Sequence, residues 1–148
     1  MFMLTKGDIV FFAENSKDSG SLAGNFSAEF YRIVGLELGL YAIFYSGIGL
    51  AARQSNLDKE IRDDFYKARA CVLYFGEAKD ASMHDDHWAL PELKHAIDRG
   101  IECLIYVGRN FPTDLLTKVG YTGQHRIVHS KEEFCEALQA DLKRLLRE

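Results

Sequence analysis

A carboxylate whose position suggests chemistry stands in the segment Asp85-Asp86-His87-Trp88-Ala89-Leu90-Pro91-Glu92-Leu93. The segment follows a strongly strand-like run, residues 70–76, and opens a helix. Pro91 fits only a first helical turn, so Glu92 is expected at a helix N-terminus. Trp88 precedes Glu92 by four residues and is expected to cover the same turn, because positions i and i+4 share a helix face. In open α/β sheets, ligands bind beyond the carboxyl ends of the strands, where this turn is expected.

The same residues also allow purely structural interpretations. Glu92 can simply complement the positive end of the helix dipole, and Trp88 can be a packing residue. His84 and His87 are three residues apart, as in some metal sites, but the sequence places no third ligand beside them. We therefore predict no metal site.

Strands and helices alternate along the chain and must position these residues. Short apolar runs predict strands at residues 8–12, 41–45, 71–75, 102–107 and 126–128. Helices are predicted at residues 28–39, 57–68 and 113–119, in a segment that carries Glu92 in its first turn and ends near residue 100, and from 131 to near the C-terminus.

The last of these helices has the clearest local signals. Ser130 and Glu133 have the spacing of a capping box, in which each side chain bonds a backbone N–H of the first turn. Phe134, Leu138 and Leu142 then recur on one helix face. The helix is therefore expected to begin at residue 131 and to pack its apolar face against a sheet.

Alternation of strands and helices with short connections predicts a single α/β domain, residues 1–148, with a doubly wound parallel sheet between two helical layers. The strands are continuous apolar runs, as expected when both faces of a sheet are covered. The common order for five strands is 2-1-3-4-5, as in flavodoxin-like proteins, with the switch point between the first and third strands. Glu92 follows the third strand and the loop 13–27 follows the first, so both should flank the crevice there.

Composition excludes several classes of protein. The chain has 148 residues, 47% of them hydrophobic, and a net charge of -4 with no basic block, so we expect no nucleic-acid partner. No apolar run reaches the roughly 18–20 residues that span a membrane. The N-terminus lacks the pattern of a signal peptide, and three cysteines without CxxC spacing are expected as buried free thiols. We therefore expect a cytoplasmic protein.

The chain resembles the Toll/interleukin-receptor (TIR) domain family in the order of its elements and in three short motifs. The first strand runs into a Ser/Asp-bearing loop at residues 11–18, and a glycine-containing loop, Ser46-Gly47-Ile48-Gly49, follows the second strand. An acidic stretch then leads to the Trp-x-x-x-Glu helix start of Trp88 and Glu92. In the NAD-consuming branch of that family this Glu is catalytic, so the resemblance implies a cytoplasmic NAD+ glycohydrolase or ADP-ribosyl cyclase in immune, antiviral signalling.

One carboxylate can suffice for that reaction. Nicotinamide leaves NAD+ as a neutral pyridine and needs no general acid, so the enzyme has to stabilise an oxocarbenium-like charge and hold the ribose hydroxyls. Glu92 is the expected catalytic residue, and Trp88 is expected to line the pocket. Phe12, Ala13, Ser46 and Gly47 are expected at the pocket or its lid.

NAD is thus expected as substrate, without a further cofactor, and self-association through TIR surfaces is expected to support activity. Two alternatives stay open. A nucleoside 2-deoxyribosyltransferase-like enzyme has the same topology and uses a Glu at the rim of the sheet as a nucleophile. A non-catalytic TIR interaction module would assemble through its helices and the loop at residues 46–49.

Overall fold

The sheet has five parallel strands in the order β2-β1-β3-β4-β5. The structure is a computed structural model and describes residues 2–14, 26–44, 67–76 and 89–147. This order and the helices on both faces confirm the predicted three-layer α/β fold of flavodoxin type. The strands are β1 (Ile9–Glu14), β2 (Tyr41–Phe44), β3 (Ala70–Phe75), β4 (Glu102–Val107) and β5 (His125–Ile127).

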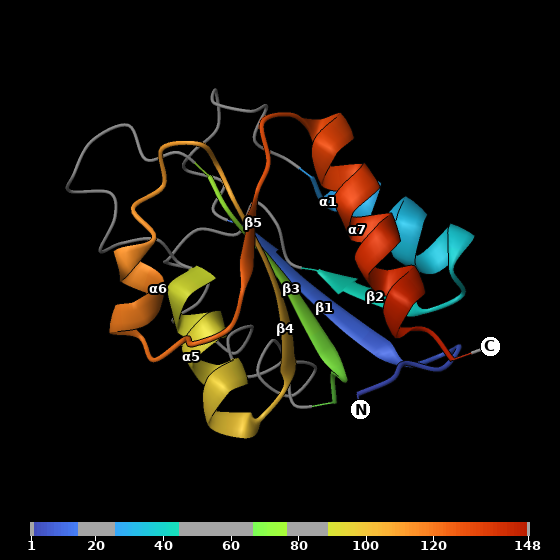
Figure 1. Cartoon of the computed structure of the whole chain (residues 1–148). Helices are drawn as coiled ribbons and strands as arrows, with labels where there is room; N and C mark the ends of the chain where they lie inside the picture. Colours follow the sequence, from blue (N-terminus) through green and yellow to red (C-terminus); the bar gives the residue numbers. More distant parts are fainter. Residues whose placement is uncertain (1, 15–25, 45–66, 77–88, 148) are drawn as a thin grey trace, which may run out of the picture.

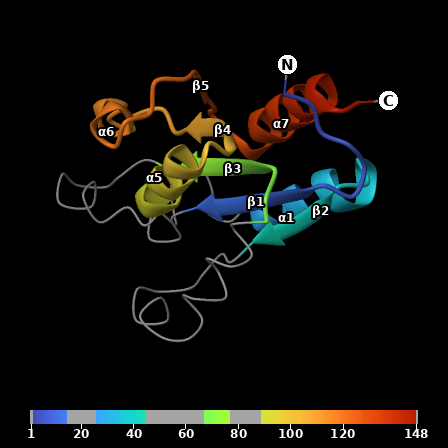
Figure 2. The ribbon, with the colours of Figure 1, turned by 90° about the horizontal axis from the view of Figure 1, so that it is seen from below.

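Helices form a layer on each face of this sheet (Figure 1). One layer contains α1 (Ser27–Tyr31), the π-helix η2 (Arg32–Glu37) and α7 (Lys131–Leu145). The other contains α5 (Ala89–Arg99) and α6 (Asp114–Lys118). Each layer packs its own apolar cluster against the sheet, so the core is divided in two by the strands. Figure 2 shows β1 and β2 pointing the same way, as a parallel sheet requires.

The central strands are buried on both sides, which explains their uninterrupted apolar sequence. All six residues of β3 are buried, and β3 pairs with β1 on one side and with β4 on the other. Residues of β1 alternate between the two clusters: Phe12 belongs to the α1/α7 side and Phe11 to the α5/α6 side. Two adjacent phenylalanines are thus needed to cover both faces of one strand.

The largest differences from the predicted boundaries concern the first strand and the first helix. β1 continues two residues beyond the predicted end, through Ala13 to Glu14. The helix predicted at residues 28–39 is a short α1 followed by a π-helical stretch, which ends with the bond from Leu38 N–H to Ile33 C=O, five residues back. The helix predicted at residues 57–68 lies outside the described residues, apart from residues 67 and 68, which are not helical.

The two ends of the chain are held together at one side of the molecule (Figure 1). Leu4 donates its N–H to the carbonyl of Leu145 at 2.7 Å, and Arg147 donates to the carbonyl of Leu4 at 2.7 Å. These two bonds attach the N-terminal segment to the end of α7. Among the described helices, none is both long and apolar enough to cross a bilayer.

Candidate functional site

Two buried carboxylates lie at the carboxyl edge of the described part of the sheet. β1 lies between β2 and β3, so the connections after β1 and after β3 leave the edge on either side of the switch point. β1 ends there at Glu14, and β3 ends at Phe75, after which the chain returns to the described part at α5. Among the described residues, the buried carboxylates of this edge are those of Glu14 and Glu92.

Glu92 lies in the first turn of α5, as the sequence predicted, and is only 6% exposed. The helix is fixed in place by its apolar stripe, in which Leu93 and Ala96 are fully buried against the β1/β3/β4 face of the sheet. A carboxylate at this end of a helix is stabilised by the helix dipole. The apolar stripe therefore holds a nearly buried acid at the start of the helix that follows β3.

Glu14 is a second buried carboxylate, which the sequence analysis did not single out. It is 3% exposed, and its Oε2 and Oε1 atoms lie 2.9 Å and 3.2 Å from the backbone nitrogen of Phe26, which donates to them. This contact links the end of β1 to the start of α1 across twelve residues of sequence. Glu14 follows Val10 and Phe12 at two-residue spacing, which places it on the same face of the strand as these buried side chains. The sequence could have indicated a buried acid here, but the predicted strand ended at residue 12.

Burial raises the pKa of Glu14 from 4.5 to about 7. The Phe26 N–H lowers this pKa, the charge of Glu29 raises it further, and the charge of Lys131 lowers it. Lys131 and Glu29 form an ion pair at 3.7 Å, so they largely offset one another. Glu14 therefore exchanges a proton near neutral pH, in the range that suits a general acid or base.

Aromatic side chains surround Glu14 on the α1/α7 face of the sheet. Tyr74 of β3 is its register partner, and the ring of Phe26 packs on that of Tyr74 with the centroids 4.5 Å apart. Phe134 of α7 packs on Phe26 at 4.7 Å between centroids and meets Tyr74 edge-on at 6.2 Å. These rings exclude water from the carboxylate and account for the effect of burial on its pKa.

The other predicted site residues lie in the core, at its edge or outside the described residues. Phe12 is fully buried, its ring stacks on that of Phe30 at 4.9 Å between centroids, and it presents no surface to a ligand. This placement follows from the position of β1 inside the sheet, where both faces are covered by helices. Ala13 is half-buried on the α5 side. Trp88, Ser46 and Gly47 lie outside the described residues, as do His84 and His87.

The described part of the chain contains neither a cluster of metal ligands nor an activated cysteine. No group of three or more His, Cys, Asp or Glu side chains is arranged there to hold a metal ion. The three cysteines are free thiols, with Cys71 fully buried and Cys103 beside it in the register of β3 and β4. Burial raises the pKa of Cys103 to about 12, so this thiol is not an activated nucleophile.

Comparison with known proteins does not assign the chain to a family. No protein-family model matches the chain, and no curated protein matches it.

Proposed function

We propose that this protein is a TIR-like enzyme that cleaves the bond between nicotinamide and ribose in NAD+, with Glu92 as the catalytic carboxylate. The observation that carries the proposal is the position of Glu92 in the first turn of α5, 6% exposed, in the connection that follows β3 at the switch point. The flavodoxin-like topology and the spacing of Trp88 and Glu92 support the same assignment.

The reaction requires little beyond this carboxylate. As the glycosidic bond breaks, the bonding electrons pass to the pyridinium nitrogen, and nicotinamide leaves as a neutral base. Positive charge develops on the ribose ring, and the negative charge of Glu92 stabilises it. Water then attacks the anomeric carbon to give ADP-ribose, or an atom of the same nucleotide attacks to give a cyclic isomer.

Glu14 favours a second candidate, a nucleoside 2-deoxyribosyltransferase-like enzyme. A nucleobase leaves a deoxyribonucleoside readily only if a nitrogen of the base is protonated, so that reaction requires an acid as well as a nucleophile. Glu14 is buried at the carboxyl end of β1 and retains a proton near neutral pH. In this alternative Glu14 supplies the proton and Glu92 is the nucleophile.

An assay with three substrates separates these candidates. The full chain at high concentration is incubated with NAD+, with NADH, and with deoxyadenosine plus a second nucleobase, and the products are resolved by chromatography and mass spectrometry. We expect nicotinamide to be released from NAD+ only, because NADH lacks the pyridinium charge that makes nicotinamide a good leaving group. Exchange of nucleobases would instead support the transferase, and no turnover of any substrate would leave the interaction module as the better hypothesis.

The variant Glu92→Gln tests the residue. It keeps the size of the side chain and removes the charge, so turnover of NAD+ should fall at least about a hundredfold while the melting temperature stays close to that of the wild type. Asp98→Asn is the matched control, because Asp98 is an exposed acid on the same helix. Turnover by Glu92→Gln at the level of Asp98→Asn would refute the catalytic assignment.

A further inference from the structure

A cavity of about 700 Å³ lies at the opposite end of the sheet, where β4 begins. β5 pairs with β4 only at residues 105–107, so within the described residues the first half of β4 has no strand on its outer side. The cavity occupies this space, and both Cys103 and Tyr121 line it from the α5/α6 side. Its volume is in the range of sites that bind small molecules.

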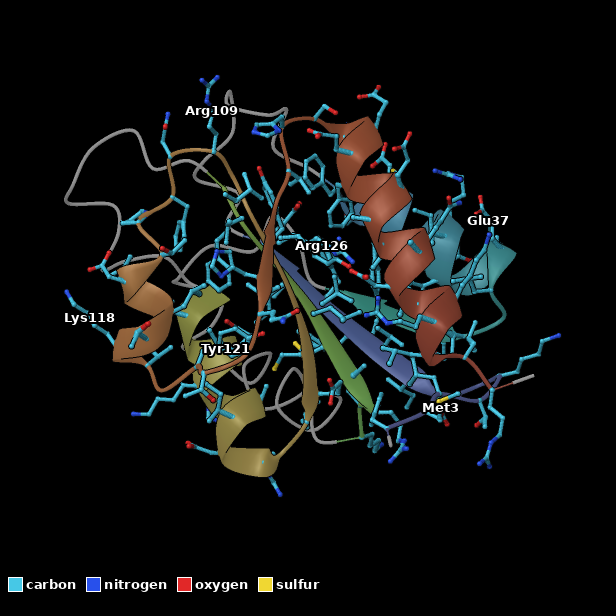
Figure 3. All side chains as sticks on the ribbon, viewed as in Figure 1. Met3, Glu37, Arg109, Lys118, Tyr121 and Arg126 are labelled. Carbon is cyan, nitrogen blue, oxygen red and sulfur yellow. The ribbon has the colours of Figure 1, made fainter. Side chains whose placement is uncertain are left out.

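An ionic cluster centred on the buried carboxylate of Asp141 forms the wall of the cavity on the side of α7. The carboxylate of Asp141, with 5% of the side chain exposed, accepts a hydrogen bond from the Tyr106 hydroxyl at 2.8 Å. It also accepts two from Arg126, through Nε at 2.9 Å and Nη2 at 2.6 Å. A fourth bond comes from Nη1 of Arg144 at 3.1 Å. Figure 3 labels Arg126, between β5 and α7.

The cluster contains two guanidinium groups but only one carboxylate, that of Asp141. Burial opposes ionisation of Asp141, but the hydrogen bonds from Arg126 and Tyr106 outweigh it and hold the pKa of this carboxyl below its usual value. Arg126 and Tyr106 already satisfy the carboxylate with three bonds, and Arg144 adds a second guanidinium. Two positive charges therefore face one negative charge, which leaves a net charge of about +1 at this wall.

Asp141 holds the two guanidinium groups in place but bonds only some of their N–H groups. Their side chains are 52% and 62% exposed for Arg126 and Arg144, and within the described part of the chain Asp141 is the only hydrogen-bond partner of either guanidinium. The remaining N–H groups are thus available to a ligand in the cavity. Guanidinium groups fixed by a carboxylate lose little entropy on binding, and their planar donors match the oxygens of a phosphate.

We propose that this cavity is a binding site for the phosphate group of a small molecule. Arg126 and Arg144 both bind that phosphate. The half-exposed ring of Tyr121 lines the same cavity and offers an apolar surface for the rest of such a molecule. Glu102 also lines it and repels an anion, so the phosphate is expected at the arginine side rather than at the start of β4. The site is at the opposite end of the strands from Glu92, and the proposal is independent of the NAD reaction.

Titration of the full chain with pyrophosphate, followed by calorimetry at low ionic strength, tests the proposal. AMP and adenosine are titrated separately to distinguish recognition of the phosphate alone from recognition of a nucleoside that carries it. We expect saturable binding of pyrophosphate, binding of AMP, and none of adenosine. Arg144→Gln should weaken the binding at least about tenfold, because it removes one charge-assisted contact.

The matched control is Lys143→Gln, which removes a neighbouring positive charge on α7 that does not line the cavity. Arg126→Gln should also weaken the binding, but it takes two bonds from buried Asp141, so its melting temperature has to be measured alongside. Two results would overturn the proposal: no saturable binding by the wild type at millimolar pyrophosphate, or equal loss of affinity in Arg144→Gln and Lys143→Gln. Neither depends on turnover of NAD+, so the two proposals can fail separately.

Discussion

Replacement of Glu14 by Gln should change how the stability of the protein depends on pH. The carboxyl group binds a proton more tightly when it is buried in the folded state than in the unfolded chain, with a pKa of about 7 against 4.5. Its favourable contribution to stability is therefore fully present below pH 4.5 and is lost as the pH rises through about 7. Since each pKa unit corresponds to about 1.4 kcal/mol, the loss between pH 4.5 and pH 8 is about 3 kcal/mol.

Other carboxyl groups act in a different range. Hydrogen bonds from the backbone and side chain of His129 lower the pKa of Glu133, and the network described above lowers that of Asp141 despite its burial. Their contributions are present above the unfolded pKa and are lost only as the pH falls further into the acid range. The five histidines of the chain are common to wild type and variant. The difference between the two proteins therefore isolates Glu14.

The free energy of unfolding is measured by urea denaturation at intervals from pH 5 to pH 8 for the wild type, Glu14→Gln and a control. Glu136→Gln serves as the control, because it makes the same substitution at an exposed position of α7. Relative to the wild type, Glu14→Gln should gain most of the expected 3 kcal/mol or so across this range, whatever its stability at pH 5. Parallel curves for wild type and Glu14→Gln would refute the assignment of a raised pKa to Glu14.

The remaining predictions concern packing and polar contacts. Phe12→Ala should cost about 3–5 kcal/mol of unfolding free energy, because the ring is fully buried between α1 and α7; a loss below about 1 kcal/mol would show that the core repacks around it. Asp141→Asn should cost about 1–2 kcal/mol, because the buried amide accepts fewer hydrogen bonds from Tyr106 and Arg126 than the carboxylate does while the half-exposed guanidinium groups stay hydrated, and calorimetric melting checks this. Ser130→Ala should cost about 1 kcal/mol through loss of the bond from Glu133 N–H, whereas Ser130→Asp should restore most of it; equal stability of all three proteins in urea would contradict the cap.

Local sequence signals determined most of the secondary structure. Ser130 caps α7 by accepting a bond from the N–H of Glu133 at 3.1 Å, and the helix begins at the next residue, as predicted. Glu133 completes the cap one residue earlier than predicted, by accepting from the N–H of His129. The predicted limits of β4 are those observed, and the strand order follows from the alternation of strands and helices. These features depend on neighbours in the chain and on the handedness of crossovers, which one sequence is enough to specify.

The position of Glu92 was equally accessible from the sequence, because a proline three residues into a helix fixes where the helix starts. Its placement at the switch point then required only the strand order. The degree of burial did not follow in the same way. Exposure of 6% depends on what packs around the first turn of α5, and the sequence does not specify those contacts.

The buried polar contacts were decided by the tertiary structure alone. Glu14 meets the Phe26 N–H twelve residues away, and Asp141 joins Tyr106 and Arg126, which are 35 and 15 residues distant in sequence. Phe12, an expected pocket residue, is placed in the core because β1 is covered on both faces. Hydrophobic periodicity reports which side of an element faces the core, but the polar groups that meet there are set by how strands and helices pack across the whole domain.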